Sequence, residues 1–160
     1  PKARLLSVDY GKNPKDYQAA PIKITFRYEI PDYALRGEGE MFFRPMVMNN
    51  LYNQVRSYIW IDTSVENRKY GFKDGCSRLV ELDETIQLPA GYKLVSAAKD
   101  ETMQGVGADF EGSLVQKGNK VLLHNRLALK KRVYEASDWE SFRNAVNAHK
   151  AYGEYLVIKK

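Results

Sequence analysis

The sequence has few of the residues from which disulfides and metal centres are usually built. Cys76 is the only cysteine, so an internal disulfide is excluded, and the only histidines are His124 and His149. No cysteine pair or carboxylate stands at metal-ligand spacing to either of them. No stretch approaches the roughly 18 consecutive apolar residues that a membrane-spanning helix needs. These absences predict no metal site, no cofactor and no membrane span in this segment.

Other absences limit the organisation of the chain. There is no internal repeat, low-complexity tract or evident linker, and 160 residues with 44% hydrophobic content suffice for one ordinary core. We therefore expect one domain over residues 1–160. The chain opens on Pro1-Lys2-Ala3-Arg4 with no signal peptide, which is typical of a piece excised from a longer multidomain protein.

Alternating apolar and polar residues are the clearest positive feature. Ile22 to Ile30 places five apolar residues on one side and four polar residues on the other, and Val121 to Val133 alternates in the same way. This period of two is the pattern of half-buried antiparallel strands. Gly118-Asn119 connects Val121 to the preceding strand as a short hairpin turn. The pattern predicts a mostly β protein, a two-sheet antiparallel β-sandwich.

One short helix is expected before the last strand. Ser137 and Glu140 have the spacing of a capping box, in which each side chain bonds the backbone of the other residue. Trp139, Phe142 and Val146 then recur on one face, so the helix is predicted over Ser137 to His149 with that face against a sheet. Residues 45–62 fit either a helix or a strand.

One residue pattern fits a cysteine enzyme: Cys76, His124 and Asp138 occur in the order nucleophile, base and orienting carboxylate. A reactive cysteine commonly sits at a helix N-terminus, whereas Cys76 follows an Asp-Gly turn and opens a strand. His124 is expected in mid-strand and Asp138 in the first helical turn. The adjacent carboxylates of Asp83 and Glu84 point to opposite faces of a strand, which argues against a glycosidase-type pair. We expect no catalytic residues.

The charge of the chain is unevenly distributed along the sequence. Residues 116–160 hold ten Lys/Arg against four Asp/Glu, and Arg126, Lys130 and Arg132 project from one strand. No aromatic residue alternates with them, so we expect no nucleic-acid site. The candidate interaction surface for protein or glycan consists of four aromatic residues that could supply stacking faces: Tyr52, Tyr58, Trp60 and Tyr70.

The second half of the chain carries a family resemblance. Ile86-Gln87-Leu88-Pro89-Ala90-Gly91-Tyr92 runs a strand into Leu-Pro-x-Gly-Tyr. Tyr134, the helix around Trp139-Glu140-Ser141-Phe142-Arg143 and the closing Tyr155 to Lys160 follow in order, and Arg68 also suits the pattern. From about residue 68 the chain resembles the C-terminal domain of unknown function that follows the transglutaminase-like core of large bacterial exported proteins.

That resemblance implies a β-sandwich accessory domain behind a core that carries its own Cys-His-Asp triad. It transfers no catalytic residue to this chain, because the residues around Cys76 and His124 differ from those of the core. The expected partner is the neighbouring transglutaminase-like domain of the same protein, and the expected location is periplasmic or at the cell surface. A free-standing carbohydrate- or protein-binding module is the main alternative, and a cysteine enzyme using Cys76 is the second.

Overall fold

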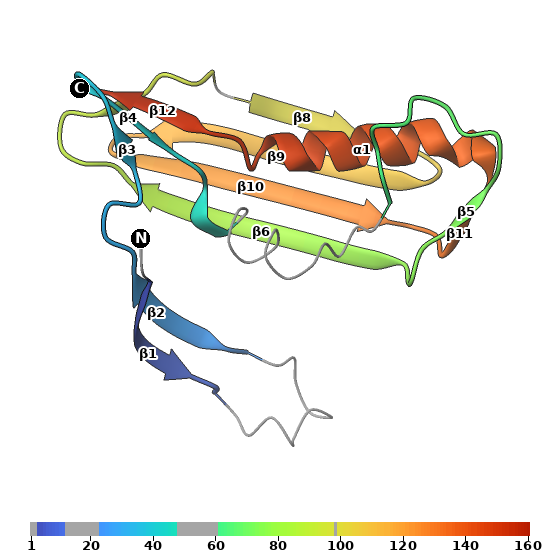
Figure 1. The fold of residues 1–160 in the computed structure, drawn as a ribbon, viewed down its shortest axis with the longest axis horizontal. Coiled ribbons are helices and arrows are strands. Elements are labelled where there is room, and N and C mark those ends of the chain that lie inside the picture. The colour runs from blue at the N-terminus through green and yellow to red at the C-terminus, as the bar shows by residue number, and fades with distance from the viewer. Residues whose placement is uncertain (1–2, 12–22, 48–60, 98) are drawn as a thin grey trace. The chain divides into compact units, whose positions relative to one another are not determined.

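Strands dominate the structure, a computed structural model that describes residues 3–11, 23–47, 61–97 and 99–160 (Figure 1). They make up 47% of the described residues, so the prediction of a mostly β protein is confirmed. The chain forms two compact units, residues 1–35 and 36–160. The single domain expected over residues 1–160 stays a prediction.

The first unit contains an antiparallel pair, β1 (Arg4–Asp9) and β2 (Thr25–Glu29). Val8 lies opposite Phe26, and Arg4 lies opposite Glu29, with which it forms an ion pair at 2.6 Å. The strand predicted over 22–30 is present as β2, but the expected burial of its apolar side is not, because Ile24 and Phe26 are 53% and 39% exposed. The alternation is present, but its apolar side is uncovered.

The main sheet of the second unit has the strand order β6-β10-β9-β8, and every neighbouring pair is antiparallel. The strands are β6 (Arg78–Gln87), β8 (Lys99–Met103), β9 (Ala108–Lys117) and β10 (Lys120–Leu129). Gly118 adopts a positive φ of 60° in the predicted turn between β9 and β10, a conformation that glycine takes without steric cost.

Two smaller sheets complete this unit. One has the order β3-β4-β12-β7, with β3 (Leu35–Arg36), β4 (Glu40–Phe43), β7 (Lys93–Leu94) and β12 (Leu156–Lys159). The other pairs β5 (Phe72–Lys73) with β11 (Val133–Tyr134). Because the described strands fall into four sheets, the finer prediction of a two-sheet sandwich is not confirmed.

The predicted helix is α1 (Trp139–Ala151), preceded by a single 3₁₀ turn, η3 (Ala136–Asp138). The predicted capping box of Ser137 and Glu140 is wrong by two residues. The box is formed by Glu135 and Asp138 instead, and the Asp138 carboxylate accepts from the Glu135 N–H at 2.9 Å. A carboxylate in this place satisfies an amide that the helix leaves unpaired.

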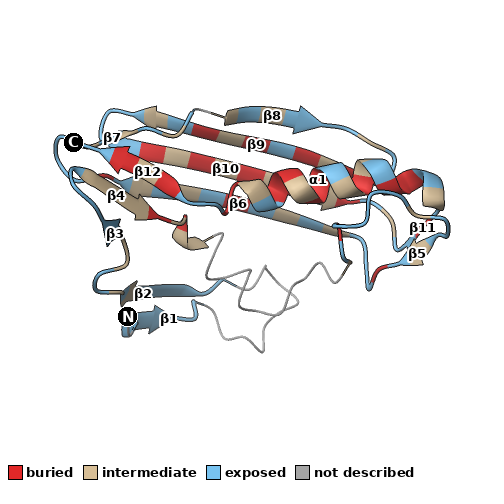
Figure 2. Cartoon of the chain, turned by 45° about the horizontal axis from the view of Figure 1, so that its top comes forward, coloured by how far each residue is buried: buried red, intermediate tan, exposed pale blue. Residues whose placement is uncertain are grey.

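The core lies between α1 and the main sheet (Figure 2). Trp139, Phe142 and Val146 are buried as predicted, and α1 packs against β9 and β10. Four alternate residues of β10 are fully buried on the same side, namely Val121, Leu123, Leu127 and Leu129. The predicted strand extends too far, however, because β10 ends at Leu129 and Val133 is 63% exposed in β11.

Candidate functional site on the outer face of the main sheet

The face of the main sheet opposite to α1 carries a group of polar side chains. In the register of β6 and β10, Asp83 lies opposite His124 and Glu81 lies opposite Arg126. Their neighbours Leu82, Leu123 and Leu127 are buried on the helix side. Because successive strand residues alternate between faces, the polar four share the other face, together with Glu111 of β9, which lies opposite Arg126. We call this the outer face.

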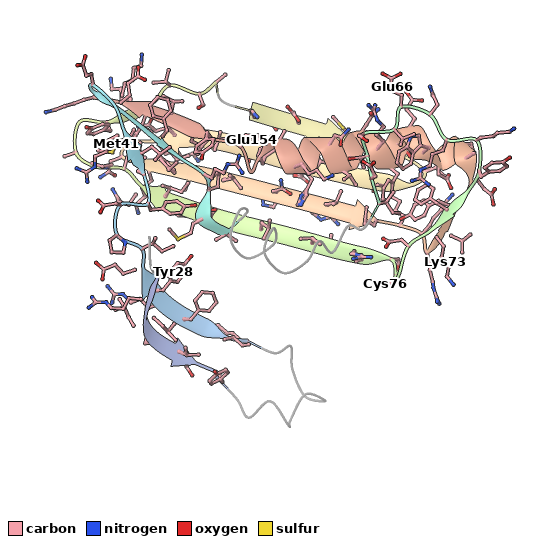
Figure 3. The ribbon with its side chains drawn as sticks, in the orientation of Figure 1. Tyr28, Met41, Glu66, Lys73, Cys76 and Glu154 are labelled. Carbon is pink, nitrogen blue, oxygen red and sulfur yellow. The ribbon has the colours of Figure 1, made fainter. Side chains whose placement is uncertain are left out.

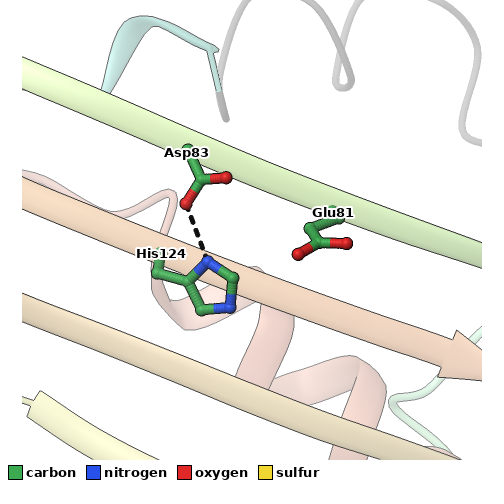
Figure 4. A group of neighbouring side chains, drawn as sticks. All are labelled: Glu81, Asp83 and His124. Atoms are coloured by element: carbon green, nitrogen blue, oxygen red, sulfur yellow. Dashed lines mark hydrogen bonds and ion pairs between the residues drawn. The ribbon is translucent and has the colours of Figure 1, made fainter.

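Three of these residues form a tight cluster (Figure 4). The Nδ1 atom of His124 lies 2.8 Å from the Oδ1 atom of Asp83. One ligating atom from each of Glu81, Asp83 and His124 lies within 4.8 Å of the other two. Glu81 and Asp83 are exposed, and the His124 side chain is 28% exposed. The cluster is therefore accessible to a small ion or to a side chain of a partner.

The sequence alone did not indicate this cluster, because no carboxylate stands at short metal-ligand spacing to His124. The signal that could have found it was the i, i+2 pair of Glu81 and Asp83 combined with the pairing of β6 and β10. The opposite orientation of Asp83 and Glu84 does hold. The Glu84 carboxylate faces away from the cluster and accepts the backbone N–H groups of Met46 and Val47 at 2.7 and 3.1 Å.

Cys76, His124 and Asp138, the three residues in the order of a cysteine-enzyme triad, lie in different places. Cys76 is exposed and precedes β6, two positions before the strand begins (Figure 3). His124 lies opposite Asp83, so roughly five strand residues, or about 17 Å, separate its row from the start of β6. Asp138 is buried at the helix start and accepts two hydrogen bonds from the Lys131 ammonium, at 2.8 and 2.9 Å. That lysine is the main cause of the lowered pKa of Asp138.

His149, the second histidine, lies in the core and packs there as a structural residue. It is buried on α1, where its Nδ1 lies 2.5 Å from Oδ1 of the fully buried Asn125, and the Asn125 amide donates to the His149 carbonyl at 3.3 Å. This bond explains the polar Asn125 on the apolar side of β10. Burial is the main cause of the pKa of His149 falling to about 4.

The basic residues predicted to project from one strand do not form a common patch. Lys130 is paired with Asp109 at 2.7 Å and donates to the Gly105 carbonyl at 2.8 Å. Arg132 lies beyond the end of β10, and Arg126 lies between two glutamates in register. Acidic residues therefore lie beside Lys130 and Arg126. The absence of a nucleic-acid partner stays a prediction.

Of the four aromatic residues named as an interaction surface, Tyr52, Tyr58 and Trp60 lie outside the described residues. Tyr70 is 72% exposed, and the Lys69 ammonium lies 5.5 Å from its ring centre.

Arg68 has a clearer role. Its guanidinium lies 4.4 Å from the Trp139 ring centre and 5.0 Å from that of Phe72. It also lines a cavity of about 410 Å³ at the start of α1, together with Glu66, Glu140 and Arg143. The Trp139 indole N–H donates to the carbonyls of Val65 and Glu66 at 3.1 and 3.2 Å, so these contacts hold the segment that precedes β5 against the helix.

Within the described residues, no helix has the length and apolar character needed to cross a membrane. A comparison with curated proteins found no significant match. Among solved structures, the chain is similar to the crystal structure of a "putative protease" from Parabacteroides distasonis ATCC 8503, with a TM-score of 0.54 and 13% identity. The similarity covers 61% of this chain and 20% of that one, so it concerns the fold alone, and the chain spans about a fifth of that protein.

The comparison with protein families gives a more definite result. Residues 39–157 match the model of DUF3858, a domain of unknown function for which a structure has been solved. The match covers the main sheet, α1 and nearly all of the second unit, whereas β1 and β2 precede it. The chain therefore belongs to the DUF3858 family.

Proposed function

We propose that this chain is a non-catalytic accessory domain of a larger exported bacterial protein with a transglutaminase-like core. We further propose that it contacts the rest of that protein through the β1–β2 hairpin. The observation that carries the proposal is the exposure of the hairpin's apolar residues. Large apolar side chains are exposed along both strands and at their ends: Leu5 62%, Leu6 46%, Val8 37%, Tyr10 58%, Ile24 53% and Phe26 39%.

An isolated two-stranded sheet is at best marginally stable in water, because it has no second layer on which to bury its apolar side. Contiguous exposed apolar surface on a folded protein commonly marks a contact with another protein surface. The hairpin also precedes the residues that match the family model. These facts fit a hairpin that completes its burial against a neighbouring part of the parent protein.

Amide hydrogen exchange would test this directly. We expect exchange of the β1 and β2 amides to slow at least about tenfold in the full-length parent relative to the 160-residue chain, because docking adds a free-energy cost to local opening. The amides of β9 and β10 are the internal control, since their face is already covered by α1, and their exchange should not change. Equal exchange of β1 and β2 in both proteins would rule out docking of the hairpin.

The cysteine-enzyme alternative makes a different prediction. A nucleophilic thiolate would be alkylated rapidly below neutral pH, and that reactivity would depend on its histidine. We expect Cys76 to be alkylated at the same rate in the wild type and in His124→Ala. Rapid, stoichiometric labelling at low pH that His124→Ala abolishes would replace the accessory function with a catalytic one.

A further inference from the structure

We propose that Glu81, Asp83 and His124 form a binding site for a divalent transition-metal ion, with Zn²⁺ as the best-fitting ion. The three side chains come from facing positions on two strands whose pairing is continuous from Lys120–Gln87 to Leu129–Arg78. One imidazole and two carboxylates are a donor set that Zn²⁺ accepts, since it binds both nitrogen and oxygen ligands. This proposal is independent of the hairpin and of the function proposed above.

The electrostatics of the cluster favour a cation. Glu81 and Asp83 place two negative charges on one side of one strand, so a cation between them would be attracted by both. Arg126 is the cross-strand neighbour of Glu81, yet within the described part of the chain the two form no ion pair. In Figure 4 the Glu81 carboxylate is turned toward the His124 ring.

The geometry needs only a small adjustment to hold the ion. Ligands of tetrahedral Zn²⁺ lie about 2.0–2.2 Å from the metal, and hence about 3.3–3.6 Å from one another. The Nδ1 of His124 and the Oδ1 of Asp83 are already 2.8 Å apart. Glu81 is exposed, so a rotamer change can bring its carboxylate in. The ion would bind between the Nδ1 atom of His124 and the Oδ1 atom of Asp83, in place of the hydrogen bond that now joins them.

Three ligands from this chain leave one coordination position open on the outer face. Water can fill that position, as can a carboxylate or imidazole of a protein surface that packs there. Arg126 should weaken metal binding, because its positive charge lies beside the ligands and repels the ion. Its removal should therefore tighten metal binding, an effect that would not follow from a purely structural role of the cluster.

Zn²⁺ titration by calorimetry of the 160-residue chain would test the site. The Cys76→Ser variant is the background, because Cys76 is an exposed free cysteine and a cysteine thiolate can bind zinc by itself. We expect one Zn²⁺ per chain, with affinity at least about tenfold weaker in His124→Ala and in Asp83→Asn, since loss of an outer-shell partner alone commonly costs 10–100-fold. Arg126→Gln should bind several-fold more tightly.

Glu111→Gln is the matched control. It removes a carboxylate of the same outer face that lies opposite Arg126 but outside the cluster, so the affinity should stay within about twofold of the background. Circular dichroism of each variant without metal checks that the sheet is intact. Binding that Glu111→Gln weakens as much as His124→Ala does, binding unchanged in His124→Ala, or the absence of stoichiometric binding would each overturn the proposal.

Discussion

Two hairpins of this chain carry the same alternation of apolar and polar residues but differ in what covers their apolar side. In the β9–β10 hairpin, Phe110, Leu114, Leu123 and Leu127 are buried, and α1 packs over both strands. In the β1–β2 hairpin, the residues of β1 are all exposed, and so are those of β2 except Tyr28, which is half-buried. Alternation thus tells which residues share a face, but not whether that face is covered within the same chain.

The difference arises from residues outside the strands. α1 contributes Trp139 and Phe142 to the covered hairpin's side of the molecule, and these pack in a ring cluster with Phe72 and Tyr134. The β1–β2 pair has its own stacked rings, Phe26 and Tyr28, with centres 5.6 Å apart. Ring contact within one strand fixes local geometry but removes far less surface from water than a covering layer does.

Trp139→Ala should give the largest change in stability. The side chain is 3% exposed, contacts Phe72 and Phe142, and lies under the Arg68 guanidinium. Its loss leaves a cavity that the surrounding rings cannot fill, so the free energy of unfolding should fall by about 3–5 kcal/mol. Urea denaturation followed by circular dichroism would measure the effect. Tyr70→Ala, at a 72% exposed ring, is the control and should cost little; a similar loss at both positions would contradict the packing.

The sequence was sufficient for the elements whose signal is local. The alternation in β10, the Gly118-Asn119 turn and the apolar face of α1 each depend on neighbouring residues, and the structure has all three. Strand ends and sheet count depend on distant partners instead. β8, which the sequence did not indicate, carries Lys99, Asp100 and Glu101 and is a strand because it pairs with β9. The helix start moved because Asp138 is held by Lys131 and Glu135.

Acid should weaken the covered hairpin through His149. The unfolded chain protonates this histidine near pH 6.5, whereas the folded protein does so only near pH 4, because burial disfavours the charged ring. The unfolded state therefore binds more protons between these values. Stability from this residue is complete above about pH 6.5 and declines as the pH falls toward 4, by on the order of 3 kcal/mol.

Unfolding free energies of the wild type and His149→Gln over this pH range would isolate the effect. The variant lacks the titrating ring but keeps a polar group that can bond Asn125. The lowered pKa values of Asp109 and Asp138 place their own loss of stability at pH values below this window. Parallel pH profiles of the two proteins would refute a buried neutral His149.

The candidate site was less predictable than the fold, for a related reason. His124 lies 41 residues along the chain from Asp83, and only the register of β6 against β10 brings it to Glu81 and Asp83. The sequence shows two histidines without a short-range metal-binding motif, but it does not show how β6 and β10 align. The same holds for the exposed β1–β2 hairpin, since nothing within residues 22–30 indicates whether another layer covers its apolar side.

A smaller loss of stability is expected when a methyl group is added on the side of β9 that α1 covers. Gly112 lies in β9, and a Cβ atom there would approach the Phe110 ring to 2.5 Å and the Tyr152 ring to 2.6 Å. Both rings are buried, so Gly112→Ala should cost about 1–3 kcal/mol through displacement of side chains and backbone. Chemical denaturation measures it. Gly75→Ala is the control, because a Cβ atom there would come no closer than 4.0 Å to another group, the Arg78 guanidinium. Equal stability of Gly112→Ala and the wild type would show that the two rings have room to move.

The smallest effect is expected on the uncovered hairpin, where Phe26→Ser should change the unfolding free energy of the second unit by no more than about 0.5 kcal/mol. Phe26 is 39% exposed, and its nearest described ring is Tyr28 in the same strand. The substitution should instead lower the binding of an apolar fluorescent dye to the folded chain, because it removes exposed apolar surface. Thr25→Ser, on the polar side of the same strand, is the matched control and should leave dye binding unchanged. If Phe26→Ser destabilised the chain as strongly as Trp139→Ala, the hairpin would be covered in solution, and the contrast between the two hairpins would be lost.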